Sequence, residues 1–145
     1  MYESALDIKH ELSVKSLLEE RWGMVLQKLP VTYNLDYMGT RDGVLLSWIE
    51  IKARNITIDQ YPSIMLSLAK FLKGIELYTL TKAPFIFVVK TVDGLYYHTY
   101  DPQLTYPIEY GGRTTQTRTP VDREPVVQIP SSWFIEIDRE NGHVA

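Results

Sequence analysis

Residues 36–52 constrain the fold of this chain most strongly, because they have the pattern of two short strands joined by a tight turn. Strand-forming residues flank Arg-Asp-Gly at 41–43, and Asp-Gly often closes a β-hairpin. Side chains alternate across a strand, so Glu50 and Lys52 would point to one face and the isoleucines beside them to the other. The pattern therefore predicts a carboxylate and an amine held together on one face of a hairpin.

Asp36 stands near the start of the first strand of this hairpin. If it faces the same way as Glu50 and Lys52, two carboxylates and one ammonium converge. Two carboxylates can hold a magnesium ion, which prefers oxygen ligands and keeps several water molecules. The alternative is a solvated Glu/Lys ion pair on a surface strand, which would contribute little to the free energy of folding.

These residues resemble the signature of the PD-(D/E)xK nuclease superfamily, which is an Asp, a hairpin of variable length and then (Asp/Glu)-x-Lys. The matching residues are Asp36, Glu50 and Lys52, and Leu35 stands where the signature has its proline, the loosest element of the pattern. The order of helix, hairpin, helix and strand over roughly residues 3–100 is also similar to the core of that superfamily. The resemblance implies a restriction-endonuclease-like fold and is strongest to small phage-type or Holliday-junction-resolvase-like members.

The resemblance also implies a chemistry. Asp36 and Glu50, with the backbone carbonyl of Ile51, would bind Mg²⁺ or Mn²⁺, which activates water and neutralises charge on the scissile phosphate. Lys52 would orient or deprotonate the attacking water, or stabilise the phosphorane. Small members of the superfamily often act as homodimers that cut two strands, so DNA, a divalent metal and a second copy of the chain are the implied partners.

Residues 3–22 are expected to form a helix that ends at Gly23, a residue suited to the position just past a helix end. Its apolar residues fall on one arc at 100° per residue, but Asp7 and Glu11 fall inside the same arc. A carboxylate buried without a partner is costly, so this part of the helix would line a site. Relatives carry a further Glu on this helix, and Glu11 is the best match by facing, with Asp7 second. The alternative is an exposed, frayed helix end.

The remaining pattern predicts an α/β fold with a mixed central β-sheet flanked by helices, in the order α-β-β-β-α-β. The apolar run 83–90 has the composition of a central strand covered on both faces, and 95–100 would return as its antiparallel partner. The other expected elements are a short strand within 24–35, a helix over about 60–80 with Asp59 as N-cap and Pro62 in its first turn, an edge strand at 126–129 and a helical turn at 130–134.

Two groups of residues are candidates for contact with DNA. Arg54, Gln60 and Tyr61 resemble positions at which relatives place a phosphate contact or a residue that orients the nucleophile; helix capping explains Gln60 equally well. Residues 101–125 are polar and rich in Gly, Pro and Thr, so we expect a loop there. Its arginines suit contacts to a phosphate backbone, although a plain surface loop is equally compatible with the composition: Arg113, Arg118 and Arg123.

Composition limits the alternatives. The 145 residues fit one domain, residues 1–145, with a loop-rich part from 101 onward. There is no cysteine, which excludes disulfides and thiolate zinc sites, and a net charge of -3 means that any DNA contact must come from a local basic patch or a metal. Neither a secretory signal nor a membrane span is visible, so a cytoplasmic protein is expected, and the phage-type resemblance implies a phage-encoded one in a bacterial host.

The sequence therefore predicts a Mg²⁺-dependent deoxyribonuclease, structure-specific or junction-resolving in its narrower form. The alternative is a non-catalytic nucleic-acid-binding or assembly protein that retains the nuclease fold. The intact set of Asp36, Glu50 and Lys52 favours the enzyme, because a protein that only binds DNA has no use for carboxylates facing a phosphate.

Overall fold

The computed structural model describes residues 5–111 and 124–137, with side chains from residue 9 onward, and contains two sheets. The larger sheet has six strands in the order β1-β2-β3-β5-β6-β9, and the smaller has three in the order β4-β8-β7. β3 and β5 are parallel and the other neighbours antiparallel, so the predicted mixed sheet with flanking helices is confirmed. In chain order the elements are α1 (Ala5–Trp22), β1 (Val25–Lys28), η1 (Val31–Tyr33), β2 (Tyr37–Arg41), β3 (Val44–Ala53), β4 (Ser63–Ser67), α2 (Leu68–Thr81), β5 (Phe85–Lys90), β6 (Leu95–Thr99), β7 (Ile108–Gly111), β8 (Glu124–Pro130), η3 (Ser131–Trp133) and β9 (Ile135–Glu136).

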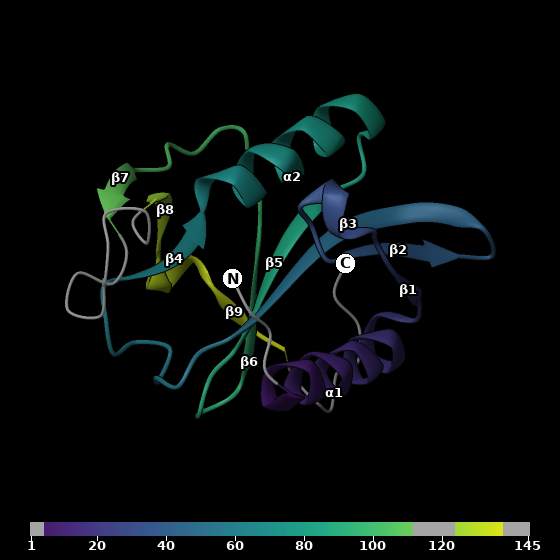
Figure 1. Cartoon of the computed structure of the whole chain (residues 1–145), viewed down its shortest axis with the longest axis horizontal. Helices are drawn as coiled ribbons and strands as arrows, with labels where there is room; N and C mark the ends of the chain where they lie inside the picture. Colours follow the sequence, from purple (N-terminus) through teal and green to yellow (C-terminus); the bar gives the residue numbers. More distant parts are fainter. Residues whose placement is uncertain (1–4, 112–123, 138–145) are drawn as a thin grey trace.

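The large sheet lies between two apolar layers (Figure 1). On one face, α1 packs Leu18 and Trp22 against Ile49 and Ile51 of β3. On the other face, α2 and the small sheet pack against the opposite side of β3 and β5, with Phe71 of α2 in this core. The alternation along β3 therefore turns its isoleucines toward α1 and the side chains between them toward α2, as the hairpin pattern predicts.

The prediction of one helix over 60–80 is wrong in its first part. Residues 63–67 form β4, and α2 begins only at Leu68. Ile64 and Leu66 are buried on one face of β4, while Ser63, Met65 and Ser67 are partly exposed. This alternation with a period of two is typical of a strand. Because residues 63–67 pair with β8, they form a strand and not the first turns of the predicted helix. Asp59 is consequently not a helix N-cap; its carboxylate accepts a hydrogen bond from Thr57 Oγ1 within the preceding loop.

Two further predictions near the C-terminus need correction. The expected loop at 101–125 contains β7 at 108–111, while residues 112–123 lie outside the described part of the chain. The expected edge strand at 126–129 is the centre of the small sheet, because β8 pairs with β4 on one side and β7 on the other. Its burial follows from this position, since Val127 and Ile129 are almost fully enclosed. The helical turn predicted after Pro130 is present as η3. No helix within residues 5–111 and 124–137 is long and apolar enough to cross a membrane.

Candidate active site

The register of the β2–β3 hairpin determines which side chains meet. The turn has positive φ at Asp42 (51°) and Gly43 (77°), the conformation of a tight hairpin turn that Asp-Gly favours. Beyond the turn, Thr40 pairs with Leu45 but Gly39 pairs with Ser47, so β3 has one extra residue at this point. This β-bulge shifts the pairing of everything that follows by one residue.

The bulge places Asp36 opposite Glu50. The last ladder pair is Tyr37 with Ile49, so the next residues on the two strands are Asp36 and Glu50. Without the bulge, Asp36 would stand opposite Ile49, whose side chain packs against α1 on the other face of the sheet. Asp36 Oδ2 also accepts a hydrogen bond of 2.9 Å from the backbone N–H of Ile51. The carboxylate of Asp36 is therefore fixed beside the Glu50 segment of β3.

Glu50 is the most enclosed ionisable side chain among the described residues that form this site, with no exposed surface. Burial raises the pKa of Glu50 from 4.5 to about 7; repulsion from Asp36 adds to the rise, while Lys70 and Lys52 oppose it. Lys70 lies 3.1 Å from Oε2, but its hydrogen bond, of 3.4 Å, is with Oε1. Within the described part of the chain, Oε2 has no hydrogen-bond partner.

Two lysines contact Glu50 from different elements. Lys52 Nζ lies 3.6 Å from Oε2, so the predicted Glu/Lys pair shares one face of β3. Lys70, in the first turn of α2, is closer and was not expected from the sequence. The local pattern gives no signal for it, because only the packing of α2 on the sheet brings residues 50 and 70 together. The spacing of residues along the helix does not distinguish Lys70 from the other charged residues of α2.

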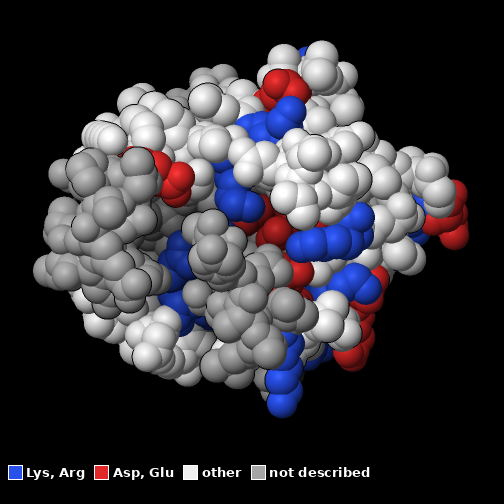
Figure 2. Space-filling view, in the orientation of Figure 1, with Lys and Arg blue, Asp and Glu red and all other residues white. Residues whose placement is uncertain are grey.

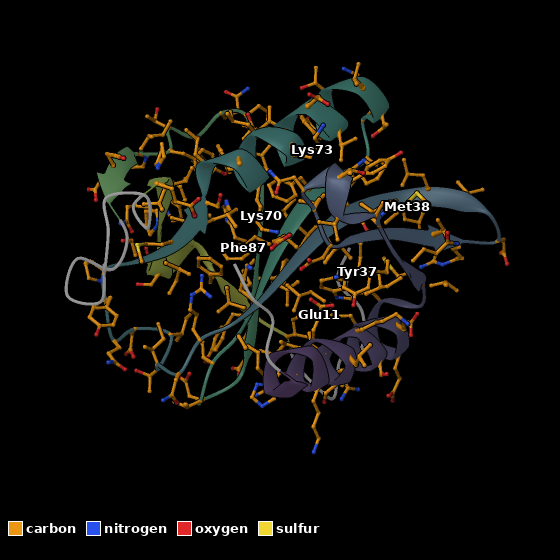
Figure 3. All side chains as sticks on the ribbon, in the orientation of Figure 1. Glu11, Tyr37, Met38, Lys70, Lys73 and Phe87 are labelled. Carbon is orange, nitrogen blue, oxygen red and sulfur yellow. The ribbon has the colours of Figure 1, made fainter. Side chains whose placement is uncertain are left out.

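Glu11 approaches the same region from α1. Tyr37 Oη donates a hydrogen bond of 2.8 Å to Glu11 Oε2, and Lys28 Nζ lies 3.0 Å from the same oxygen. Lys28 Nζ also lies 3.5 Å from Asp36 Oδ1, so this ammonium links the two carboxylates. Figure 3 shows Glu11 and Tyr37 beside each other on the α1 side of the sheet. Asp7 lies in α1, but its side chain is outside the described part of the chain.

The charges of this face form a compact pattern. Figure 2 shows acidic side chains at the centre of the visible face, with Lys and Arg side chains on both sides of them. The buried Oε2 of Glu50 forms ion pairs with Lys52 and Lys70 and lies next to a second carboxylate, so the two carboxylates offer the oxygen ligands that a hard cation prefers. No group of three or more His, Cys, Asp or Glu side chains within the described ranges could hold a metal ion.

The other candidate residues lie in different surroundings. Arg54 follows β3 and donates to the carbonyls of Ala53 (3.3 Å) and Met65 (3.4 Å). The backbone N–H of Gln60 donates a hydrogen bond to the carbonyl of Thr57, and the side-chain Oε1 of Gln60 accepts one from the N–H of Thr57. These two bonds form a local turn. The carbonyl of Tyr61 accepts a hydrogen bond from Ser131, and its side chain is exposed. The arginines of the expected loop lie outside the described residues: Arg113, Arg118 and Arg123.

Comparisons with known proteins identify a family for the sequence and a solved structure with a similar fold. A family model described as "Phage putative PDDEXK endonuclease" matches residues 1–137. The structure is similar to that of Hjc, a Holliday junction resolvase from the archaeal hyperthermophile Archaeoglobus fulgidus, with a TM-score of 0.60 and 15% sequence identity over 97% of this chain and 99% of that chain. At this identity the likeness establishes a common fold. No curated protein matches the sequence.

Proposed function

The chain belongs to the phage PDDEXK endonuclease family, and we propose from this premise that it is a metal-dependent nuclease that hydrolyses phosphodiester bonds in DNA. The observation that carries the proposal is the hairpin register, which brings Asp36 opposite Glu50. Lys52 extends from the same face of β3 as Glu50. Two carboxylates on one face of the sheet can hold the cation used in metal-assisted hydrolysis of a phosphodiester, and an ammonium beside them can stabilise developing negative charge.

The proposed roles follow from the chemistry of each group. Asp36, Glu50 and the backbone carbonyl of Ile51 would hold Mg²⁺ or Mn²⁺ through oxygen atoms. When bound, the cation would lower the pKa of a water molecule and neutralise charge on the scissile phosphate. Lys52 would orient or deprotonate the attacking water, or stabilise negative charge that develops on the phosphate. Glu11 would support Asp36 through the ammonium that both carboxylates contact.

In this proposal, residues 1–145 form one nuclease domain, and its substrate is DNA. Contacts to the phosphate backbone would position the DNA without reading its bases. The narrower form of the proposal is structure-specific or junction-resolving cleavage by a homodimer, inside a phage-infected bacterial cell. The likeness to a junction resolvase supports the junction-resolving part, and the phage endonuclease family supports the phage origin. The residues proposed for DNA contact are Arg54, Gln60, Tyr61, Arg113, Arg118 and Arg123.

Cleavage of supercoiled plasmid in the presence of Mg²⁺ or Mn²⁺ tests the proposal. We expect the wild type to nick the plasmid and Asp36→Asn, Glu50→Gln and Lys52→Ala each to lose at least about 100-fold in rate. Asp42→Asn is the matched control, because it makes the same chemical change in the same hairpin at an exposed turn position whose positive φ suits Asn.

Two outcomes would overturn the proposal. In the first, purified wild type binds DNA but cleaves none with either metal, which would favour the non-catalytic binding or assembly protein. In the second, Glu50→Gln cleaves as fast as Asp42→Asn, which would separate any activity from the two carboxylates.

A further inference from the structure

Lys70 is the closest cation to the buried carboxylate of Glu50 among the described residues. Its Nζ lies 3.1 Å from Oε2, against 3.6 Å for Lys52, and its side chain is 18% exposed. It reaches Glu50 from α2, so the two lysines approach the carboxylate from two different elements. Figure 3 shows Lys70 extending from α2 toward the strands of the large sheet.

The approach of α2 to the sheet explains this contact. Gly74 follows Lys70 by one helical turn, and a Cβ at Gly74 would lie 2.3 Å from the ring of Phe85 on β5. Only a glycine allows the helix backbone to come this close to the sheet. Lys70 is thereby brought within reach of Glu50, whereas Lys73 pairs with Glu76 on the outside of the same helix.

The charge balance around Glu50 suggests what Lys70 binds. Asp36 and Glu50 together carry at most two negative charges, and two ammonium groups contact Oε2 of Glu50. A divalent cation held by Asp36 and Glu50 would repel both ammonium groups. Lys70 would then need another anion, and its flexible four-carbon stem allows the ammonium to move without moving α2.

We propose that Lys70 binds a non-bridging oxygen of the scissile phosphate of DNA. This inference rests on the proposed function and adds a phosphate-binding residue on α2 to the groups carried by the hairpin. Lys70 exchanges the carboxylate of Glu50 for the phosphate when substrate binds. An ammonium acts as a point charge on phosphate, so the contact requires no fixed planar geometry.

DNA binding without metal, in the Glu50→Gln background, isolates this contact. The substitution removes the competing negative charge, so Glu50→Gln should bind a short duplex more tightly than the wild type in EDTA. Adding Lys70→Met should lower that affinity about tenfold, the value of one charge-assisted contact. It should also reduce the log–log salt slope by about 0.9. Adding Lys73→Met, the control one turn along α2, should change neither quantity.

Cleavage provides the second measurement. In the otherwise wild-type protein, Lys70→Met should lower the single-turnover rate at saturating DNA by at least about tenfold, while Lys73→Met retains the wild-type rate. If Lys70→Met has a lower melting temperature than the wild type, Lys70→Gln replaces it as the test variant.

The outcomes separate this inference from the proposed function. Equal DNA affinity, salt slope and cleavage rate in the Lys70 and Lys73 variants would overturn the role of Lys70 while the wild type still cleaves DNA. A wild type that cleaves no DNA would overturn the proposed function. In that case the difference in affinity between the two double variants alone decides whether Lys70 contacts phosphate.

Discussion

Asp36 and Glu50 stand opposite each other on one hairpin, but their surroundings differ. Asp36 accepts a hydrogen bond from the N–H of Ile51 and lies near the half-exposed ammonium of Lys28. Glu50 is fully enclosed, has an oxygen without a hydrogen-bond donor within the described residues, and has a pKa raised to about 7. The backbone holds Asp36 in place, whereas the fold keeps Glu50 ionised only at a cost in free energy. We infer that the buried carboxylate of Glu50 lowers the free energy of unfolding and is present because the active site needs it.

The largest effect should come from Glu50→Gln. A carboxyl whose pKa is higher in the folded state favours folding at low pH, and this advantage is lost between pH 4.5 and about 7. The rise corresponds to about 3 kcal/mol, so Glu50→Gln should stabilise the metal-free protein by up to about 3 kcal/mol at pH 8.

Urea unfolding at pH 4 and pH 8 measures this difference, which should shrink toward zero at pH 4. Destabilisation of Glu50→Gln at pH 8 would mean that the ion pairs with Lys52 and Lys70 outweigh the burial of the charge, and the contrast between the two carboxylates would fail.

The bulge that relates the two carboxylates can be tested at Gly39. A Cβ there would lie 2.6 Å from both Met24 Sδ and Ser47 Oγ, so these side chains must move. Gly39→Ala should cost about 1–2 kcal/mol of unfolding free energy by overpacking. Urea unfolding checks the cost. Gly43→Ala is unsuitable as a control because Gly43 has a positive φ. An unchanged stability would show that the side chains of Met24 and Ser47 move aside at little cost and that the hairpin beside the bulge is not tightly packed.

Asp36 should respond to the shape of its replacement. Asp36→Ala leaves the buried N–H of Ile51 without its acceptor and should cost about 1–2 kcal/mol. Asp36→Asn keeps an oxygen for this N–H and relieves the repulsion with Glu50, so it should melt no lower than the wild type without metal. Thermal melts in EDTA compare the two variants. A large loss of melting temperature in Asp36→Asn would mark Asp36 as a structural residue whose charge is needed for folding.

Lys28 should contribute least. Its side chain is 46% exposed, and ion pairs at such positions contribute about 0–1 kcal/mol. Lys28→Met should therefore change the free energy of unfolding by less than about 1 kcal/mol, measured by urea unfolding in parallel with the Asp36 variants. A larger loss would show that the link between Glu11 and Asp36 matters for folding as much as the backbone hydrogen bond does.

The local parts of this arrangement could be predicted from the sequence, and the tertiary parts could not. Alternation along one strand is enough to place Glu50 and Lys52 on one face, and Asp-Gly is enough to locate the turn. The bulge cannot be recognised from the sequence pattern. The sequence therefore could not decide which face of the sheet Asp36 occupies. Lys70 reaches Glu50 because α2 packs closely on β5 at Gly74, a contact between distant segments. The short apolar run of β4 has no length or flanking signal that separates a strand from a helix.

Titration with Mn²⁺ tests the central claim most directly, namely that Asp36 and Glu50 share one cation. Isothermal titration calorimetry at pH 8, above the pKa of Glu50, should show binding to the wild type and to Asp42→Asn with equal affinity. Asp36→Asn and Glu50→Gln should each weaken binding at least about tenfold, a loss of about 1.4 kcal/mol. Wild-type affinity in Asp36→Asn, with binding lost only in Glu50→Gln, would contradict the account, because the two carboxylates would then not hold the same ion.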